Sequence, residues 1–261
     1  MTRAIILAAG EGNRLRPHTE DRPKALVPLA GKPLLEWQLE VLARVGIDDI
    51  TIATGYRADQ LESYGTRRVH NPRFDSTNMV VSLIAAREQL LSGDDLLIAY
   101  GDIIYQPNIV KALLADEADV SITIDLGWQS LWAMRMEDPL EDAETLRLDD
   151  DGNVIELGNP PKSLDEIEGQ YMGLIRVSAS GAEKMVAAID AIDPETRFGG
   201  RTPDAMYMTD LLQHLIDSGI AVHAVPVEGG WLEVDTVEDL ERFEDLHTRG
   251  LLDTRFDPLR D

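Results

Sequence analysis

The sequence predicts an α/β protein with a mostly parallel sheet flanked by helices, and two observations carry this prediction. Short apolar runs alternate with segments of helical spacing along the first half of the chain. The runs at 3–9 and 96–100 consist almost wholly of apolar residues, as strands buried on both faces do. Strands that alternate with helices usually pair in parallel, which places helices on both faces of the sheet.

The elements of the first half follow in a regular order. Strands are expected at 3–9, 49–54, 96–100 and 118–125, and helices at 34–45, 56–61 and 79–91. Pro33 precedes the first helix and Gly46 follows it, which matches the preference for proline at helix starts and glycine at helix ends.

The rhythm changes between about 126 and 177, where we expect a small antiparallel insert. Segments 144–148 and 153–157 form a predicted hairpin around an Asp-Gly-containing turn, and 171–177 adds a further antiparallel segment. Helices are then expected at 179–189, at 205–218 and from Val237, with strands at 221–226 and 231–235. We expect a single domain over 1–250 and a loosely held tail at 251–261.

Composition excludes several classes of protein. The chain of 261 residues has no cysteine, which excludes disulfides, thiolate metal sites and cysteine nucleophiles. Its formal charge of −24 opposes binding to nucleic acid or to anionic membranes. No apolar run is long enough to span a bilayer and no signal peptide is visible, so we expect a cytoplasmic protein. A homodimer is compatible with the sequence, which does not determine the oligomeric state.

The segment 7–33, LAAGEGNRLRPHTEDRPKALVPLAGKP, carries the strongest functional signal. Gly10 and Gly12 allow a sharp turn whose amide groups approach an anion, and Arg14 and Lys24 add positive charge to an acidic protein. Neither standard phosphate motif is present, because Leu15 replaces the third glycine of G-x-G-x-x-G and the Walker pattern is absent. The residues indicate a polyphosphate site, with an ordinary basic surface loop as the structural alternative.

This segment resembles the signature of sugar-1-phosphate nucleotidylyltransferases, L-A-A-G-x-G-x-R-L-x-P-x-T-x-x-x-P-K-x-L-x-P-x-x-G-K-P, and fills each fixed position. The resemblance implies a Rossmann-like (GT-A-like) fold. It also implies that Arg14 holds the β- and γ-phosphates and that Lys24 stabilises the α-phosphoryl group. The residues that it assigns to nucleotide binding in this loop are Leu7, Ala8, Ala9, Gly10, Gly12 and Asn13.

Two aspartates are candidate ligands of Mg²⁺, which favours one or two carboxylates together with substrate phosphates. Asp102 and Asp235 each follow a predicted strand, and ligands of open α/β sheets gather at the carboxyl ends of strands. Turn formation or helix capping is the structural alternative for both. The family resemblance agrees with the metal role, because its G-D and V-D-T motifs match Gly101-Asp102 and 234–236. It also assigns Gly101 to nucleotide binding.

Residues 71–86, NPRFDSTNMVVSLIAA, resemble a segment of phosphocholine and phosphonate cytidylyltransferases, N-x-x-[FY]-x-x-[TY]-N-N-x-x-S-L. Met79 replaces the second asparagine of that pattern. The resemblance implies that four residues of this segment bind the nucleotide: Asn71, Thr77, Asn78 and Ser82. Helix capping by Thr77 or Asn78 is an alternative that can coexist with binding.

The acceptor site is the least determined part of the sequence. Aromatic faces attract quaternary ammonium groups and carboxylates supply a counter-charge, whereas core packing is the commoner fate of any single tryptophan. Arg135 and Lys162 are the basic candidates for binding the acceptor phosphate or phosphonate. The other candidates for the acceptor pocket are Trp128, Trp132, Glu144, Tyr171, Trp231 and Glu233.

These assignments predict a Mg²⁺-dependent enzyme that transfers CMP from CTP to a small anionic phospho-acceptor. A phosphocholine-like or aminoethylphosphonate-like acceptor fits the resemblance best. A sugar-1-phosphate uridylyl- or thymidylyltransferase is the alternative within the same chemistry. A catalytically silent regulatory subunit is the alternative from another class.

Overall fold

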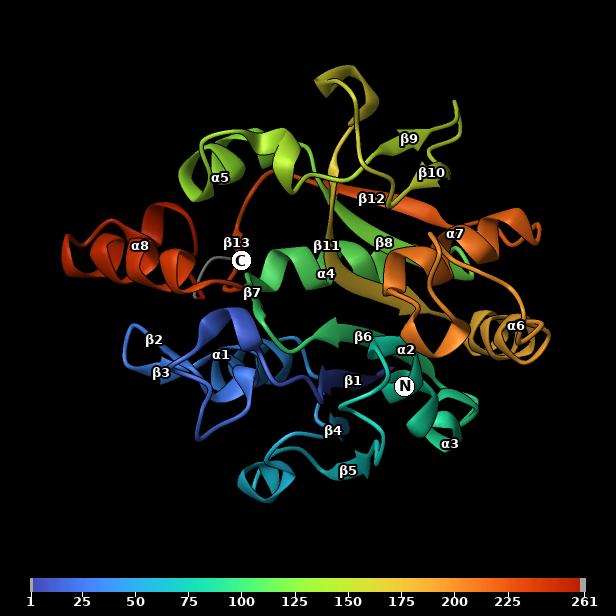
Figure 1. Ribbon diagram of the computed structural model, residues 1–261, viewed down its shortest axis with the longest axis horizontal. Coiled ribbons are helices and arrows are strands. Elements are labelled where there is room, and N and C mark those ends of the chain that lie inside the picture. Colours follow the sequence, from blue (N-terminus) through green and yellow to red (C-terminus); the bar gives the residue numbers. More distant parts are fainter. Residues whose placement is uncertain (1, 259–261) are drawn as a thin grey trace.

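A seven-stranded sheet forms the centre of the computed structural model, which describes residues 2–258 (Figure 1). Six strands are parallel, and β11 runs antiparallel to both of its neighbours. In spatial order the strands are β12 (His223–Val227), β8 (Val120–Asp125), β11 (Gln170–Val177), β6 (Asp95–Tyr100), β1 (Thr2–Ala8), β4 (Ile50–Thr54) and β5 (Arg67–His70).

Helices cover both faces of this sheet because successive strand residues point to opposite sides. Ile5 of β1 belongs to one buried cluster and Ile6 to the other. The first cluster includes α2 (Met79–Ala85), α3 (Arg87–Leu90), α6 (Ala179–Asp190) and α7 (Met208–Asp217). The second includes α1 (Leu34–Arg44), α4 (Pro107–Ala115), α5 (Trp128–Arg135) and α8 (Val237–Thr248). Within residues 2–258, no helix combines the length and apolarity that crossing a membrane requires.

Within the described residues, three two-stranded ribbons accompany the central sheet. They are β2 (Pro28–Leu29) with β3 (Lys32–Pro33), β7 (Ile103–Tyr105) with β13 (Trp231–Glu233), and β9 (Leu146–Leu148) with β10 (Val154–Leu157). Short 3₁₀ turns lie at Asn13–Leu15, Lys24–Leu26, Ala58–Leu61, Pro139–Glu141, Leu164–Glu166, Pro203–Ala205 and Leu252–Thr254.

The structure confirms the predicted fold class and the β9–β10 hairpin, and it corrects the predicted insert. Segment 171–177 is β11, which lies inside the central sheet between β8 and β6 and therefore does not belong to a separate insert. The insert also contains a helix, α5, which packs beside α8 (Figure 1). The helix predicted at 79–91 is two helices that meet at Ala86. Elements β5, β7 and α4 were not predicted.

The predicted loose tail is also corrected. Leu252 and Phe256 are 5% and 1% exposed, and the Phe256 ring packs edge-on against Trp37 at 5.5 Å between centroids. The part of the tail up to residue 258 is therefore attached to the core by two apolar side chains. Residues 259–261 lie outside the described residues.

Candidate active site

The ends of β1 and β6 touch at the carboxyl edge of the sheet. The amide of Gly101 donates a hydrogen bond to the carbonyl oxygen of Leu7 at 2.9 Å. A Cβ atom at position 101 would lie only 2.6 Å from that oxygen, so only glycine fits without a backbone shift. This close approach places Asp102 directly beside the glycine-containing loop.

The β7–β13 ribbon brings the two predicted metal ligands together. The amide of Val234 donates to the carbonyl oxygen of Asp102 at 3.0 Å, next to the pairing of Glu233 with Ile103. Asp102 and Asp235 therefore lie on neighbouring strand ends although they are far apart in the sequence. This ribbon depends on β7, a strand that was not expected from the sequence pattern.

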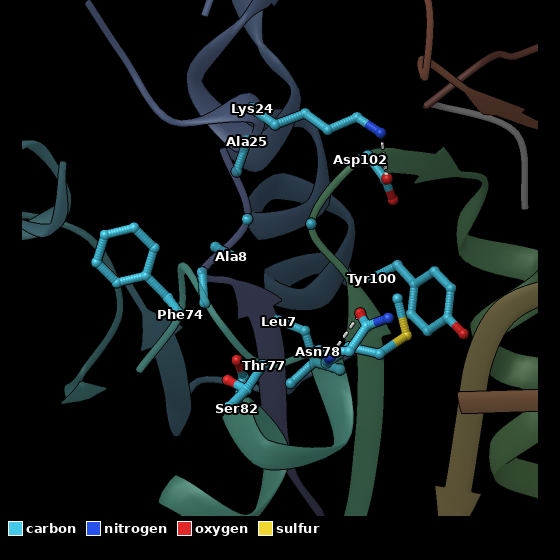
Figure 2. Close-up of a pocket in the computed structure, with 14 residues that line it drawn as sticks. Leu7, Ala8, Lys24, Ala25, Phe74, Thr77, Asn78, Ser82, Tyr100 and Asp102 are labelled. Atoms are coloured by element: carbon cyan, nitrogen blue, oxygen red, sulfur yellow. Dashed lines mark hydrogen bonds and ion pairs between the residues drawn. The ribbon is translucent and has the colours of Figure 1, made fainter. Parts of the chain in front are cut away.

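Lys24 bridges the two aspartates. Its Nζ lies 2.6 Å from Oδ2 of Asp102 and 2.5 Å from Oδ1 of Asp235. Figure 2 shows the side chain reaching across the mouth of the pocket to Asp102. Arg14, whose side chain is 66% exposed, contacts the other Asp235 oxygen at 2.5 Å. Burial alone would lower the pKa of Lys24, but the nearby carboxylates outweigh this effect and hold that pKa above its usual value.

The turn at Gly12 positions Lys24. Gly12 has a φ of +66°, and Thr19 Oγ1 donates to its carbonyl oxygen at 2.8 Å. A Cβ atom at Gly12 would lie 2.9 Å from the Cβ of Lys24, so the loop folds directly against the lysine stem. Gly12 and Asn13 shape this loop and do not line the pocket beside it.

A pocket opens between the first loop, the start of α2 and the end of β6 (Figure 2). Its walls include most of the residues that were expected to bind the nucleotide, together with Lys24 and Asp102. These predicted residues are Leu7, Ala8, Ala9, Gly10, Thr77, Asn78, Ser82 and Gly101. The walls also include Ala25, Phe74, Met79 and Tyr100, which were not singled out as site residues.

Asn71 lies behind the pocket wall. It is 1% exposed, and its Nδ2 donates to Thr77 Oγ1 and Ser82 Oγ, both at 3.0 Å. Asn78 is the N-cap of α2, and its Oδ1 accepts a hydrogen bond from the amide of Met79 at 2.8 Å. The predicted capping role is therefore confirmed for Asn78, and its side chain also faces the pocket.

The three tryptophans proposed for the acceptor pocket lie in the hydrophobic core. Trp128, Trp132 and Trp231 are 2%, 4% and 3% exposed, and Trp132 packs against the other two rings. The indole of Trp231 donates to the buried carboxylate of Asp125 at 2.9 Å. Core packing, the structural alternative, explains the positions of all three tryptophans. The prediction that these side chains line the acceptor pocket is therefore corrected.

Two half-buried carboxylates, Glu144 and Glu233, lie close to Tyr100 and Asp102. Burial raises the pKa of Glu233 to about 7, with Asp102 and Asp235 adding to the effect and Arg135 opposing it. Burial likewise raises the pKa of Glu144 to about 7, with Glu233 as the strongest neighbouring charge. Among residues 2–258, no group donates a hydrogen bond to the Glu144 carboxylate. Tyr171 stands edge-on to Tyr100 at 5.8 Å between ring centroids.

The pattern of the MobA-like NTP transferase domain matches residues 4–153, which include the first loop, the pocket and Asp102. The chain belongs to this family. It is a nucleotidyltransferase, as predicted from the first loop.

Cytidylyltransferases are prominent among the relatives of this nucleotidyltransferase. It is 37% identical over 247 residues to CTP:phosphoglutamine cytidylyltransferase of Campylobacter jejuni, an alignment that covers 91% of this chain and 97% of the relative. It is 49% identical over 92 residues to choline-phosphate cytidylyltransferase of Streptococcus pneumoniae, covering 34% and 40% of the two chains. The solved structure of CTP:phosphocholine cytidylyltransferase from Streptococcus pneumoniae superposes with a TM-score of 0.70 at 28% identity, covering 94% and 98%.

The basic residues proposed for the acceptor of this nucleotidyltransferase occupy different environments. The side chain of Arg135 is 2% exposed and forms ion pairs with Glu233 and Asp239. The proposal that it binds the acceptor phosphate directly is therefore corrected, because its charge is already paired inside the protein. Lys162 is exposed in the loop after β10, where its backbone amide donates to Glu166.

The aspartate pair fits a divalent cation. Oδ1 of Asp102 is buried and accepts no hydrogen bond from the described residues, while its other oxygen already faces a positive charge. Within residues 2–258, no set of three or more His, Cys, Asp or Glu side chains is arranged to hold a metal ion. Asp102 and Asp235 would therefore hold Mg²⁺ only together with ligands from the substrate, as is usual for Mg²⁺ bound to phosphates.

Proposed function

We propose that this nucleotidyltransferase is a Mg²⁺-dependent cytidylyltransferase that transfers CMP from CTP to a small acceptor carrying a phosphate or phosphonate and an ammonium group. The observation that carries the proposal is the convergence of Lys24 and Arg14 on Asp102 and Asp235, beside a pocket with a glycine-containing wall. The cytidylyltransferase relatives support CTP as the donor.

The pocket supports binding of the nucleoside and the first phosphate. Backbone of the loop at 7–10 forms one wall, and the hydroxyl groups of Thr77 and Ser82 lie on the other. Because Asn71 orients both hydroxyl groups from behind, they are prepared to bind a base or ribose edge. The exposed guanidinium of Arg14 is placed to hold the phosphates that leave as pyrophosphate.

The acceptor amine is inferred from the carboxylates near Tyr100. The Glu144 carboxylate forms no ion pair or hydrogen bond with the described residues. Its strongest neighbouring charges, Glu233, Asp142 and Asp210, are acidic, and the more distant Arg201 opposes them only in part. Partial loss of hydration is costly for a carboxylate without an ion-pair partner, and an ammonium group of the acceptor would relieve that cost. Tyr171 and Tyr100 would supply aromatic surface beside the same charge. Lys162 remains a candidate for the acceptor phosphate.

The reaction that follows is an in-line displacement. An acceptor oxygen bonds to the α-phosphorus while the bond from that phosphorus to the β-bridging oxygen breaks, and pyrophosphate leaves with the electron pair. Because the attacking oxygen is already anionic, no side chain has to remove a proton. Lys24 stabilises the charge that develops on the α-phosphoryl group, and Arg14 stabilises the departing charge. Bound Mg²⁺ supplies further charge neutralisation at the phosphates.

A pyrophosphate-release assay tests this proposal. CTP, UTP, dTTP and ATP are each combined with phosphocholine, 2-aminoethylphosphonate, phosphoglutamine and glucose 1-phosphate. We expect turnover with CTP and at least one amine-bearing acceptor, abolished by EDTA and restored by Mg²⁺. Turnover with UTP or dTTP and glucose 1-phosphate alone would instead establish the sugar-nucleotide alternative. No turnover, together with no Mg²⁺-dependent nucleotide binding in calorimetry, would favour a regulatory subunit.

A further inference from the structure

Arg135 connects the helix α5 to the segment that carries Asp235. Its Nε and Nη2 donate to the two carboxylate oxygens of Asp239 at 2.9 and 3.1 Å, and its Nη1 donates to Glu233 at 2.8 Å. Both partners belong to the chain around Asp235, one before it and one after it. The guanidinium therefore holds this segment from two sides.

Asp239 transmits this contact to the backbone of the proposed metal ligand. Its Oδ2 accepts hydrogen bonds from the amides of Asp235 at 3.1 Å and Thr236 at 3.0 Å. Thr236 Oγ1 in turn accepts a hydrogen bond from the amide of Asp239, which completes a capping box at the start of α8. The orientation of the Asp239 carboxylate therefore determines the peptide geometry at Asp235.

Burial makes this network rigid. The side chains of Arg135 and Asp239 are each 2% exposed, and the guanidinium also lies over the ring of Trp132 at 5.2 Å. A buried bidentate pair of this kind has little freedom to rearrange, and removing one partner leaves an uncompensated charge. Substrate cannot reach the guanidinium in this arrangement, so Arg135 acts through its neighbours.

We propose that Arg135 is a positioning residue that fixes Asp235 through Asp239 and holds Glu233 at the acceptor side of the site. This inference rests on the proposed function, because it assumes that Asp235 takes part in binding the metal–nucleotide. In characterised metal sites, mutation of a group that orients a metal ligand typically lowers metal affinity or activity by about 10- to 100-fold. Arg135 thus couples α5, which lies in the predicted insert, to the metal side of the site.

The test compares Arg135→Met and Arg135→Lys with a matched control, Arg176→Met. Arg176 is a buried arginine in β11 that pairs with Asp95 at 2.7 Å and also donates to the carbonyl oxygen of Ala118. It lies near the start of β6, at the edge of the sheet opposite the site. Both methionine variants remove the charge of a buried arginine side chain from an ion pair, although Asp95 is 38% exposed; only Arg135→Met loses the connection to Asp235.

Four quantities are measured for each variant: the thermal unfolding midpoint, the Mn²⁺ dissociation constant with CTP by electron paramagnetic resonance, and kcat and KM for pyrophosphate release. For Arg135→Met we expect Mn²⁺ binding about 10-fold weaker or more, and a comparable or larger fall in kcat with a smaller change in the KM for CTP. Arg135→Lys should recover part of both losses. Arg176→Met should lower the unfolding midpoint while Mn²⁺ binding stays within about twofold of the wild type.

Asp239→Asn serves if Arg135→Met does not fold. Both oxygens of the Asp239 carboxylate accept hydrogen bonds from N–H groups. The NH₂ group of an asparagine must therefore replace one of these oxygens and cannot accept a hydrogen bond there. We expect the same loss of Mn²⁺ affinity in this isosteric variant. Unchanged Mn²⁺ binding and kcat in a folded Arg135 or Asp239 variant, or an equal loss in Arg176→Met, would overturn the positioning role. An inactive wild type that binds no Mn²⁺ would instead refute the proposed function.

Discussion

At the scale of single residues, Lys24 is the central group of the site because it lies between two carboxylates that we propose as metal ligands. Its ammonium group lies where a metal cation would be attracted. In the absence of ligand, the positive charge of Lys24 therefore offsets the negative charges of Asp102 and Asp235. A metal ion and the Lys24 ammonium group should therefore compete for the carboxylates of Asp102 and Asp235. The competition should end when the substrate phosphates bind and pair with Lys24.

Lys24→Met should change turnover and metal binding in opposite directions. We expect kcat to fall at least about 100-fold, in line with the loss of a charge aimed at the transition state. In the absence of nucleotide, Mn²⁺ should bind about 10-fold more tightly, because removing one positive charge from two adjacent carboxylates strengthens their attraction for a cation. Mn²⁺ titration and steady-state kinetics measure the two effects.

Lys32→Met is the control for this variant, because Lys32 pairs with the exposed carboxylate of Glu40 outside the pocket. Both quantities should remain close to those of the wild type in the control. Weaker Mn²⁺ binding by Lys24→Met than by the wild type would contradict the competition between lysine and metal.

Glu144 should make stability depend on pH. Burial raises its pKa from the usual 4.5 to about 7, with Glu233, Asp142 and Asp210 contributing to the rise and Arg201 opposing it. Between pH 4.5 and 7 the folded state retains a proton that the unfolded state has lost, so stability falls as pH rises through this window. The total loss in the free energy of unfolding across this window is at most on the order of 3 kcal/mol.

Glu144→Gln should remove this fall. The variant should match the wild type near pH 4 and exceed it increasingly from pH 5 to 8, as measured by urea denaturation at each pH. Glu183→Gln, at an exposed position of α6, should give parallel wild-type and variant curves. A Glu144→Gln variant whose pH profile parallels that of the wild type would show that Glu144 titrates normally.

At the scale of secondary-structure elements, the site depends on two backbone contacts between neighbouring strands. Gly101 lies against Leu7 at the ends of β6 and β1, and Val234 pairs with Asp102 beside the β7–β13 ribbon. The side chains that we assign to the metal follow these contacts directly, so a small displacement of either strand end would move a carboxylate.

Gly101→Ala tests this dependence. The added Cβ would lie 2.6 Å from the Leu7 oxygen, which forces the strand ends apart. We expect a loss of about 1–3 kcal/mol in the free energy of unfolding, as overpacked sites commonly show. Gly10→Ala is the stability control, since nothing lies within 4 Å of a Cβ at that position, and it should differ from the wild type by no more than about 0.5 kcal/mol. Equal unfolding free energies for the two variants would refute the proposed strain.

At the scale of the whole molecule, the chain carries a formal net charge of −24, although its first loop contains several positive side chains. Such a charge destabilises the compact state by self-repulsion and opposes the approach of an anionic nucleotide. Salt screens both effects, because the Debye length falls from about 30 Å at 0.01 M to about 3 Å at 1 M ionic strength.

The unfolding temperature should therefore rise with ionic strength, by several degrees between roughly 0.01 M and 1 M sodium chloride. Sodium and potassium chloride should give similar rises at equal ionic strength, because screening does not depend on the identity of the ion. Differential scanning calorimetry at constant pH measures the effect. An unfolding temperature that falls or stays constant as salt is added would show that self-repulsion contributes little to stability.

The sequence by itself determined the α/β class, the order of most elements and the combination of turn glycines with positive charge in the first loop. These properties follow from local patterns, because strand and helix periodicities, turn glycines and the spacing of Arg14 and Lys24 can be read within short windows. The capping alternative for Asn78 was also local, and it was confirmed.

Only the tertiary structure decided which distant groups meet and which side chains are buried. It placed segment 171–177 in the central sheet, put three tryptophans in the core and enclosed Arg135 between two carboxylates. It also brought Asp102 and Asp235 to the same ammonium group through the unpredicted ribbon. Burial and long-range pairing arise from the packing of the whole chain, so no short window of sequence contains them.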